Sequence, residues 1–277
     1  MTRQLITMSL ILAAIVGLAA GGSVLATPSS GLEEIDGDLF DDWKICRTRA
    51  QGEDGFYQIT RSSFRPVIAL ESLGENAHTA YDLGRQFKDK YPDPLPRARA
   101  IFSFVRDRVN YTPDIDQFRH DEFAQNADEL AIVIREKGVG YGDCEDTAVL
   151  LAVMYKGAGQ RSAIAVGPGH TAALVYLPEY QKTPTAFELD GEPGWVWCEA
   201  TGRNNPMGWI PKESAGSEFA AYEITEDEAI TSAEPPSRPS TAVARTGGGG
   251  SSSQPFPFFG IMLLFWLIPL FRRRRAR

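Results

Sequence analysis

Apolar residues recur at helical spacing through much of the first half of the chain. In residues 95–109 this spacing places Ile101, Phe102 and Val105 on one face, and Pro96 lies in the first turn, where proline fits a helix. A proline or a glycine also follows each of the neighbouring patterns. The spacing therefore predicts helices over residues 76–91, 95–109 and 127–137, and a further helix that begins at Cys144.

Beyond residue 160 the period shortens, and glycine and proline separate short apolar runs. The turn Gly167-Pro168-Gly169 lies between two such runs, and residues 191–194 lie between two others. These runs predict β-strands at residues 162–166, 171–177, 185–189 and 195–199. Helices followed by antiparallel strands indicate an α+β domain.

Two other parts of the chain carry weaker patterns. Alternation in residues 56–60 suggests a strand, and residues 67–70 form another short apolar run. From about residue 226 the composition changes to proline, serine and glycine. This composition cannot bury a core, so it predicts a flexible linker over residues 226–254.

Both ends of the chain are apolar. Residues 1–26 have Val24 and Ala26 at the positions of a cleavage site, as in a signal peptide, and their apolar stretch is also long enough for a membrane anchor. Residues 255–271 are apolar and residues 272–277 are basic, which predicts a transmembrane segment with a cytoplasmic tail. The same layout is similar to microbial C-terminal sorting signals. In either case, the middle of the chain is expected on the extracytoplasmic side of the cell membrane.

Charge and cysteine content narrow the possible functions. The chain has 36 acidic and 28 basic residues, and no basic stripe is visible outside the C-terminal tail, so we expect no nucleic-acid partner. Three cysteines are too few for a disulfide framework. In an exported domain, a disulfide between Cys46 and Cys198 would leave Cys144 as the free thiol.

Cys144 is the candidate nucleophile. It follows Gly140 and Gly142, which allow a tight turn, and it opens the predicted apolar helix. A helix start favours a thiolate because unpaired backbone N–H groups and the positive end of the helix dipole stabilise negative charge. The alternative interpretation is an ordinary buried cysteine at the start of a helix.

A thiol nucleophile needs a base, and the base needs a group that orients its ring. His78 and His120 lie in polar surroundings, whereas His170 follows a Gly-Pro-Gly turn at the head of an apolar strand. Glu199 ends an aromatic strand, where a buried carboxylate would require a partner. The alternatives are a structural role for His170 and a solvent-facing position for Glu199.

Taken together, these residues resemble the transglutaminase-like superfamily, a branch of the papain-like cysteine enzymes, over residues 96–211. The resemblance rests on three motifs in chain order: Gly142-Asp-Cys-Glu-Asp146, Gly169-His170 and Trp197-Cys-Glu-Ala-Thr201.

The resemblance implies Cys144 as the nucleophile, His170 as the general base and acid, and Glu199 as the carboxylate that orients the imidazole. It also implies a papain-like α+β core, with the cysteine at the N-terminus of a central helix packed on an antiparallel sheet. Two features depart from the family pattern. Glu199 stands where aspartate is usual, and Thr171 and Ala172 stand where an aromatic residue is common.

These observations divide the chain into six parts: a signal peptide or membrane anchor (1–26), an N-terminal extension with helices (27–94), a transglutaminase-like catalytic core (95–225), a flexible linker (226–254), a transmembrane segment (255–271) and a basic cytoplasmic tail (272–277).

The expected function is that of an extracytoplasmic, membrane-anchored thiol enzyme. It would act on amide bonds of protein or peptide substrates through a thioester, either by hydrolysis or by acyl transfer. The alternative is a catalytically inactive binding or scaffold module of the cell envelope. The acidic residues lack the spacing of a calcium loop, so we expect no metal and no cofactor; they are Asp114, Asp116, Asp143, Glu145 and Asp146.

Overall fold

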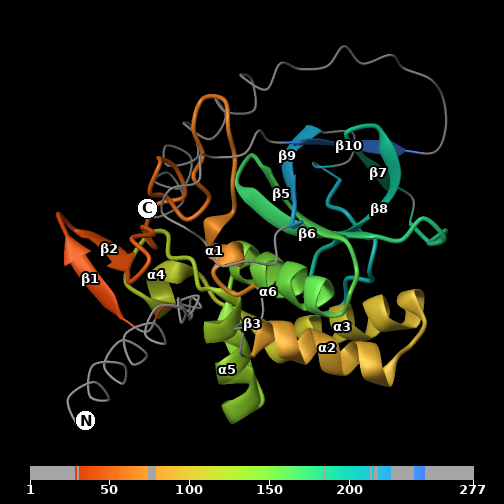
Figure 1. Ribbon diagram of the computed structural model, residues 1–277, viewed down its shortest axis with the longest axis horizontal. Coiled ribbons are helices and arrows are strands. Elements are labelled where there is room, and N and C mark those ends of the chain that lie inside the picture. Colours follow the sequence, from red (N-terminus) through yellow and green to blue (C-terminus); the bar gives the residue numbers. More distant parts are fainter. Residues whose placement is uncertain are drawn as a thin grey trace, which may run out of the picture.

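The computed structural model describes residues 31–73, 79–183, 185–212, 218–225 and 240–246, together with Ser29 and Ser214 (Figure 1). Its helices are α1 (Val67–Leu70), α2 (Ala80–Lys90), α3 (Pro94–Arg108), α4 (Asp114–Gln117), α5 (Ala127–Lys137) and α6 (Cys144–Gly157). Its strands are β1 (Leu32–Ile35), β2 (Asp38–Asp41), β3 (Val109–Tyr111), β4 (Gly140–Gly142), β5 (Ser162–Gly167), β6 (His170–Tyr176), β7 (Thr185–Leu189), β8 (Glu192–Cys198), β9 (Glu218–Glu223) and β10 (Ser240–Thr246). Helices and antiparallel strands occur together, which confirms the α+β prediction.

Helices form where local start and stop signals predicted them. α5 begins after Asn126, whose side chain accepts the Glu129 N–H at 2.9 Å, and it is followed by Gly138 with a φ of 78°. Asn126 is a typical N-cap, and a left-handed glycine is a typical helix stop. α3 confirms the predicted helix over 95–109. α2 begins at Ala80, and the preceding residues 74–78 lie outside the described residues.

Six strands form a closed antiparallel barrel in the order β10-β7-β8-β6-β5-β9 (Figure 1). Strands β5 to β8 confirm the four predicted strands, whereas the pattern did not predict β9. β10 shows that the predicted flexible linker over 226–254 is wrong for residues 240–246. Their backbone pairs with β7 on one side and with β9 on the other. The rest of that predicted linker lies outside the described residues.

Alternate residues of the barrel strands face two different cores. The barrel interior contains Ala163, Ala165, Ala172, Leu174, Trp195 and Trp197. The opposite face, toward α6, contains Ile164, Val166, Ala173, Val175, Val196 and Cys198. Small alanines on β5 and β6 leave room inside the barrel for the two indoles of β8. The period-2 alternation thus builds both the barrel interior and the surface on which α6 packs.

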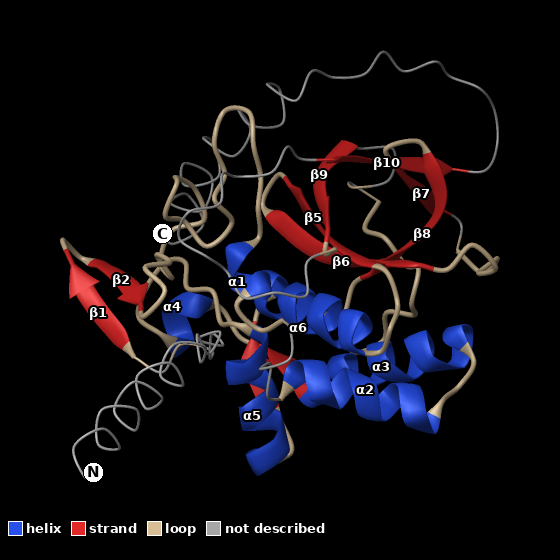
Figure 2. Ribbon diagram, viewed as in Figure 1, coloured by secondary structure: helices blue, strands red, loops and turns tan. Residues whose placement is uncertain are grey.

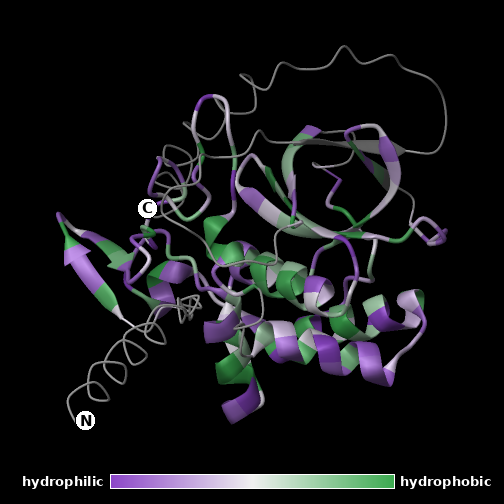
Figure 3. Ribbon diagram, viewed as in Figure 1, coloured by the Kyte–Doolittle hydropathy of each residue, from purple (hydrophilic) through white to green (hydrophobic). Residues whose placement is uncertain are grey.

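Helix α6 lies between the barrel and the other long helices. One side packs on β5 and β6, and the other contacts α2, α3 and α5 (Figure 2). Figure 3 shows α6 as hydrophobic over most of its length, whereas the helices around it alternate between hydrophobic and hydrophilic residues. A Cβ at Gly84 of α2 would lie 2.1 Å from the Met154 carbonyl oxygen of α6, so glycine permits this close crossing. This arrangement confirms a central helix packed on an antiparallel sheet.

The N-terminal extension differs from the sequence pattern. Residues 56–60 do not form the suggested strand, because the chain turns at Gln58, which has a φ of 42° and donates its N–H to the Gly55 carbonyl at 2.8 Å. The apolar run at 67–70 is helix α1. Its four side chains are all buried, and α1 packs against α6.

A buried arginine joins this extension to the helices. The Arg47 guanidinium contacts the carboxylates of Asp41 at 2.6 Å, Glu71 at 3.1 Å and Glu129 at 2.9 Å. Because Glu129 lies on α5, the contacts fix the extension against the helical layer. Burial of the arginine requires such partners.

The suggested disulfide between Cys46 and Cys198 is wrong, since both cysteines are free and buried. Cys198 faces α6, where its sulfur lies 3.4 Å from the Tyr155 hydroxyl. Cys46 lies in the extension, with its sulfur 3.7 Å from Thr48 Oγ1. The two side chains therefore belong to different environments.

Among the residues that the structure describes, no helix has the length and apolar character needed to cross a membrane. The predictions for residues 1–26 and 255–277 lie outside the described residues.

Candidate active site

Two glycines that lie close to neighbouring side chains precede Cys144. Strand β4 pairs in parallel with β3, and α6 begins directly after Asp143. A Cβ at Gly142 would lie 2.6 Å from Asp146 Oδ2, and a Cβ at Gly140 would lie 2.6 Å from Leu130 Cδ1. Close packing therefore requires both glycines, but the tight turn predicted before the cysteine is wrong, because residues 140–142 form strand β4.

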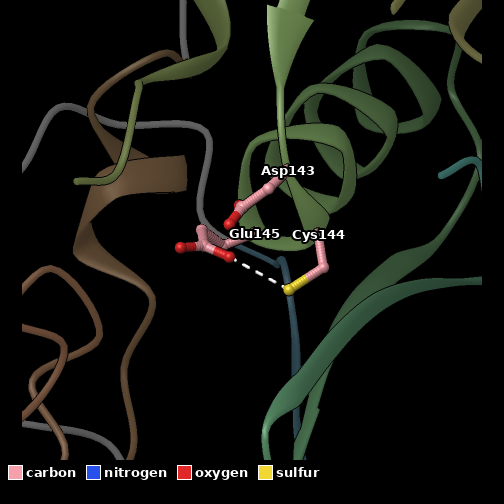
Figure 4. Close-up of side chains that lie close together, drawn as sticks. All are labelled: Asp143, Cys144 and Glu145. Carbon is pink, nitrogen blue, oxygen red and sulfur yellow. Dashed lines mark hydrogen bonds between the residues drawn. The ribbon is translucent and has the colours of Figure 1, made fainter. Parts of the chain in front are cut away.

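The surroundings of the thiol favour its protonated form. Cys144 is 9% exposed, and its sulfur donates a hydrogen bond to Glu145 Oε2 at 3.0 Å (Figure 4). Burial raises the pKa of Cys144 well above its ordinary value, the charges of Glu145 and Asp143 raise it further, and the Thr171 backbone N–H offsets part of this rise. A helix dipole contributes only about 0.3–2 kcal/mol. Hence the prediction that the helix start would favour a thiolate is wrong, because burial and two carboxylates outweigh the dipole.

The carboxylates beside the thiol are themselves buried. Burial raises the pKa values of Glu145 and Asp146 well above their ordinary range, and the nearby Asp143 raises both further. Asp146 accepts hydrogen bonds from the Gln125 N–H at 2.8 Å and from Gln125 Nε2 at 2.7 Å. Glu145 Oε1 and Asp143 Oδ1 are buried without a hydrogen-bond partner among the described residues. The first turn of α6 therefore brings several carboxylates close together, and their burial and mutual repulsion favour the protonated forms.

The same side chains have the composition of a cation site. Three overlapping groups bring one ligand atom of each residue within 4.8 Å of the others: Asp143 with Cys144 and Glu145, Asp114 with Asp143 and Asp146, and Asp114 with Glu122 and Glu145. Carboxylate oxygens are the ligands that calcium and magnesium prefer. The chain folding, rather than the spacing along the sequence, brings Asp114 and Glu122 to the helix start. The expectation that no metal is bound stays a prediction.

His170 and Glu199 form a pair at the adjoining ends of β6 and β8. Glu199 Oε2 contacts His170 Nε2, and Glu199 Oε1 accepts hydrogen bonds from the hydroxyl of Thr201 and from its N–H at 3.2 Å. Glu199 is 3% exposed, so the alternative of a solvent-facing carboxylate is wrong. Burial acts to raise the pKa of Glu199, but the hydrogen bond and charge of His170, with help from Thr201, bring it below its ordinary value.

An aromatic ring fixes the imidazole from the barrel side. The Trp197 ring stacks on His170 with a centroid distance of 6.0 Å and an interplanar angle of 29°. Trp197 points into the barrel interior, where Phe187 stacks on it at 5.2 Å. The sequence alone indicated no role for Trp197 or Thr201, although both lie in the motif that contains Glu199.

The structure places the three predicted site residues in two groups. His170 and Glu199 are in contact, and Nε2 is the ring nitrogen that contacts the carboxylate. The Cys144 thiol borders the N–H of Thr171, the residue after His170, but its hydrogen bond goes to Glu145. The complete triad of Cys144, His170 and Glu199 therefore stays a prediction.

Comparison with known protein families gives one match, which covers the candidate site residues. The model of the transglutaminase-like superfamily matches residues 81–213. This segment belongs to the transglutaminase-like superfamily. It contains Cys144, His170 and Glu199, and it excludes most of the N-terminal extension and the barrel strands β9 and β10. The transglutaminase-like segment thus starts nearer the N-terminus than the resemblance over residues 96–211 indicated.

Two solved structures show a remote likeness. A candidate protease from Parabacteroides distasonis is 16% identical with a TM-score of 0.31, and the match covers 53% of this chain and 31% of that one. A candidate cysteine protease from Cytophaga hutchinsonii is 12% identical with a TM-score of 0.29, and the match covers 65% of this chain and 55% of that one. This chain therefore spans about a third and about half of those two structures, and likenesses this remote carry no argument here. No curated protein matches the chain.

Proposed function

We propose that the protein is a thiol enzyme that cleaves or transfers amide bonds of protein or peptide substrates, with Cys144, His170 and Glu199 as its catalytic residues. The observation that carries this proposal is the contact of His170 with the buried Glu199, next to Thr171, whose N–H borders the Cys144 thiol. A carboxylate on Nε2 fixes the ring and leaves Nδ1 as the nitrogen that can serve the thiol.

The proposed reaction begins with transfer of the Cys144 proton to His170 Nδ1. The sulfur attacks the amide carbon, the C–S bond forms, and the C–N bond breaks as His170 returns the proton to the leaving amine. Water or a second amine then attacks the thioester and gives a proton to His170. The acid or the new amide leaves, and the sulfur recovers the proton.

Two features of the site support this sequence of proton transfers. The Glu199 carboxylate, whose pKa is lowered, stabilises the imidazolium that forms during each transfer. To reach His170, the thiol must exchange its hydrogen bond to Glu145 for one to the imidazole. Backbone N–H groups at the start of α6, including that of Cys144, are natural donors to the oxyanion.

The proposal also covers the cellular setting. The enzyme would work on the extracytoplasmic side of the cell membrane, held there by its terminal apolar segments. This part rests on the sequence of residues 1–26 and 255–271.

The decisive experiment measures acylation of Cys144. Purified protein is mixed with p-nitrophenyl acetate, and mass spectrometry locates the acetyl group; casein with a fluorescent amine then compares peptide release with amine incorporation. We expect Cys144→Ala to abolish acylation and turnover while circular dichroism stays native. Glu199→Gln should leave reduced but measurable rates, because the imidazole loses its orienting charge. Cys46→Ala, which removes a buried thiol in the extension, is the matched control and should behave as wild type.

The binding-module alternative makes the opposite prediction. Acylation of wild type no faster than that of Cys144→Ala, together with no effect of His170→Ala, would exclude a catalytic triad and favour a module without turnover.

A further inference from the structure

Thr201 holds the carboxylate that contacts the imidazole. Glu199 Oε1 accepts a hydrogen bond from the Thr201 hydroxyl and another from the Thr201 N–H at 3.2 Å, while Glu199 Oε2 contacts His170 Nε2. The two oxygens of one carboxylate thus face two different residues. Because both oxygens are engaged, the plane of the carboxylate is fixed relative to the imidazole ring.

A glutamate depends on such contacts more than an aspartate would. The side chain of Glu199 has one more rotatable bond than the aspartate that is usual at this position, so more conformational freedom must be restricted to hold its carboxylate in one place. Glu199 is only 3% exposed, which leaves little access for water to its oxygens. Among the described residues, the hydrogen bonds to Oε1 come from Thr201.

The backbone that follows Thr201 is fixed in a tight turn. The Asn205 N–H donates to the Gly202 carbonyl at 3.0 Å, and a Cβ at Gly202 would lie 2.4 Å from Asn205 Nδ2. Arg106 of α3 donates to the Asn205 carbonyl at 3.2 Å. The turn is therefore attached to the helical layer, and this attachment restrains Thr201 at its start.

A second arginine connects the same turn to the strands that precede the cysteine. Arg203 Nη2 donates to Asn110 Oδ1 at 2.7 Å. Asn110 lies on β3 and pairs with Tyr141 of β4, the strand that ends just before Asp143 and the start of α6. The segment that carries Thr201 is thus joined both to the carboxylate of Glu199 and to the strands next to Cys144.

We infer that Thr201 is a positioning residue, which holds Glu199 in the orientation that directs the His170 ring for proton exchange with Cys144. The inference rests on the proposed function. Each proton transfer to the ring creates an imidazolium, and the carboxylate stabilises it only while Oε2 stays on Nε2. Without the Thr201 hydroxyl, the carboxylate can rotate away from Nε2, and the ring is then free to turn out of line with the sulfur.

The first test compares two substitutions of Thr201. Thr201→Val keeps the shape of the side chain and removes the hydroxyl, whereas Thr201→Ser keeps the hydroxyl and removes the methyl group. The measured quantity is the rate of Cys144 acylation by p-nitrophenyl acetate. We expect Thr201→Val to slow it by roughly 10–100-fold, the usual effect of losing a hydrogen bond to a charged group, and Thr201→Ser to react nearly as fast as wild type.

The matched control is Thr48→Val. Thr48 is also a half-buried threonine whose hydroxyl donates to a carboxylate, that of Asp38 at 2.9 Å, but it lies in the N-terminal extension. Its substitution should leave the acylation rate unchanged. The melting temperature of every variant is measured, so that a loss of the fold is separated from a loss of rate.

The second test is a double-mutant cycle of Thr201→Val with Glu199→Ala. A residue that acts only through the Glu199 carboxylate has no effect once that carboxylate is gone. We therefore expect the double variant to acylate as slowly as Glu199→Ala alone, with no additional loss from Thr201→Val.

Three results would overturn the inference. Equal acylation in wild type and Thr201→Val would show that the hydroxyl does not position Glu199. Equal losses in Thr201→Val and Thr201→Ser would assign the effect to packing of the methyl group. Losses that multiply in the double variant would show that Thr201 acts independently of Glu199. Absence of any Cys144-dependent acylation in wild type would instead refute the proposed function, and with it this role of Thr201.

Discussion

Replacing Glu71 by glutamine should remove a large pH dependence of stability from the contacts that hold the N-terminal extension. Three carboxylates surround the single guanidinium of Arg47, so the group carries an excess of negative charge. The side chains of Asp41 and Glu71 are 0% exposed, whereas Glu129 is 36% exposed and partly screened by solvent. Burial raises the pKa of Glu71 from 4.5 to about 8, although Arg47 lowers it, and Asp41 raises it further.

The direction of this pH dependence follows from whether the folded or the unfolded chain holds the proton on Glu71. Between pH 4.5 and about 8 the folded protein keeps a proton on Glu71 that the unfolded chain has released. The free energy of unfolding therefore falls with rising pH, by about 1.4 kcal/mol per pH unit from this group alone. Over the whole window the loss is on the order of 5 kcal/mol: the stabilisation is present in full below the lower pKa and is gone above the upper one.

Glu71→Gln cannot ionise at any pH, but its NH₂ group must face a donor, because Asn126 Nδ2 donates to one oxygen of Glu71 and Arg47 donates to the other. We therefore expect the variant to carry a constant loss of stability, and its difference from wild type to move in the variant's favour as the pH rises from 5 to 9. Urea unfolding at half-unit steps from pH 5 to pH 9 measures the difference. Glu145 and Asp146 titrate in the same direction, but they are present in both proteins and cancel in the comparison.

A matched control is Glu33→Gln, since this carboxylate is 66% exposed and pairs with the exposed Lys44. Its pH profile should follow that of wild type. Parallel profiles for wild type and Glu71→Gln would refute the assignment of the proton to Glu71. They would show that ionised carboxylates alone balance the charge of Arg47.

Two further predictions concern α6. Glu145→Gln should move the midpoint of iodoacetamide labelling of Cys144 to lower pH, because it removes one of the two charges that raise the pKa of the thiol. The labelling is measured with and without a chelator. A midpoint that is unchanged or higher would contradict this electrostatic explanation. Gly84→Ala should lower the melting temperature, because its Cβ would lie 2.1 Å from the Met154 carbonyl oxygen, and forcing two packed helices apart costs about 1–3 kcal/mol against a gain of about 1 kcal/mol in helix propensity. An unchanged or higher melting temperature in that variant would show that α2 and α6 separate without cost.

The sequence predicted elements whose causes are local. α5 has the bounds that the pattern indicated, because Asn126 and Gly138 are its cap and its stop. β10 was missed because its stability comes from distant partners. Ala242 pairs with Leu189 on one side and with Phe219 on the other, and neither pairing can be read from a segment flanked by serine and glycine.

In the candidate site too, the features with local causes could be predicted and those that depend on tertiary packing could not. His170 and Glu199 could be predicted because each lies in a short motif beside an apolar strand, and their contact follows from the pairing of β6 with β8. The direction of the Glu145 side chain could not be predicted, since a residue next to a nucleophile can point toward it or away from it.

The Cys144 thiol and the Glu145 carboxylate beside it influence each other's protonation. When Glu145 is ionised, it accepts a hydrogen bond from the Cys144 thiol, with 3.0 Å between Sγ and Oε2, and its charge disfavours a thiolate. When Glu145 is neutral, its own O–H can donate to the sulfur, and the same contact then stabilises a thiolate. Burial raises the pKa of Glu145, so its charge appears at a higher pH than that of an ordinary carboxyl. Reactivity of Cys144 is therefore expected to depend on which of the two groups holds the proton, with the helix dipole as a minor contribution. An amide at position 145 can donate but cannot ionise, and for this reason Glu145→Gln tests the account directly.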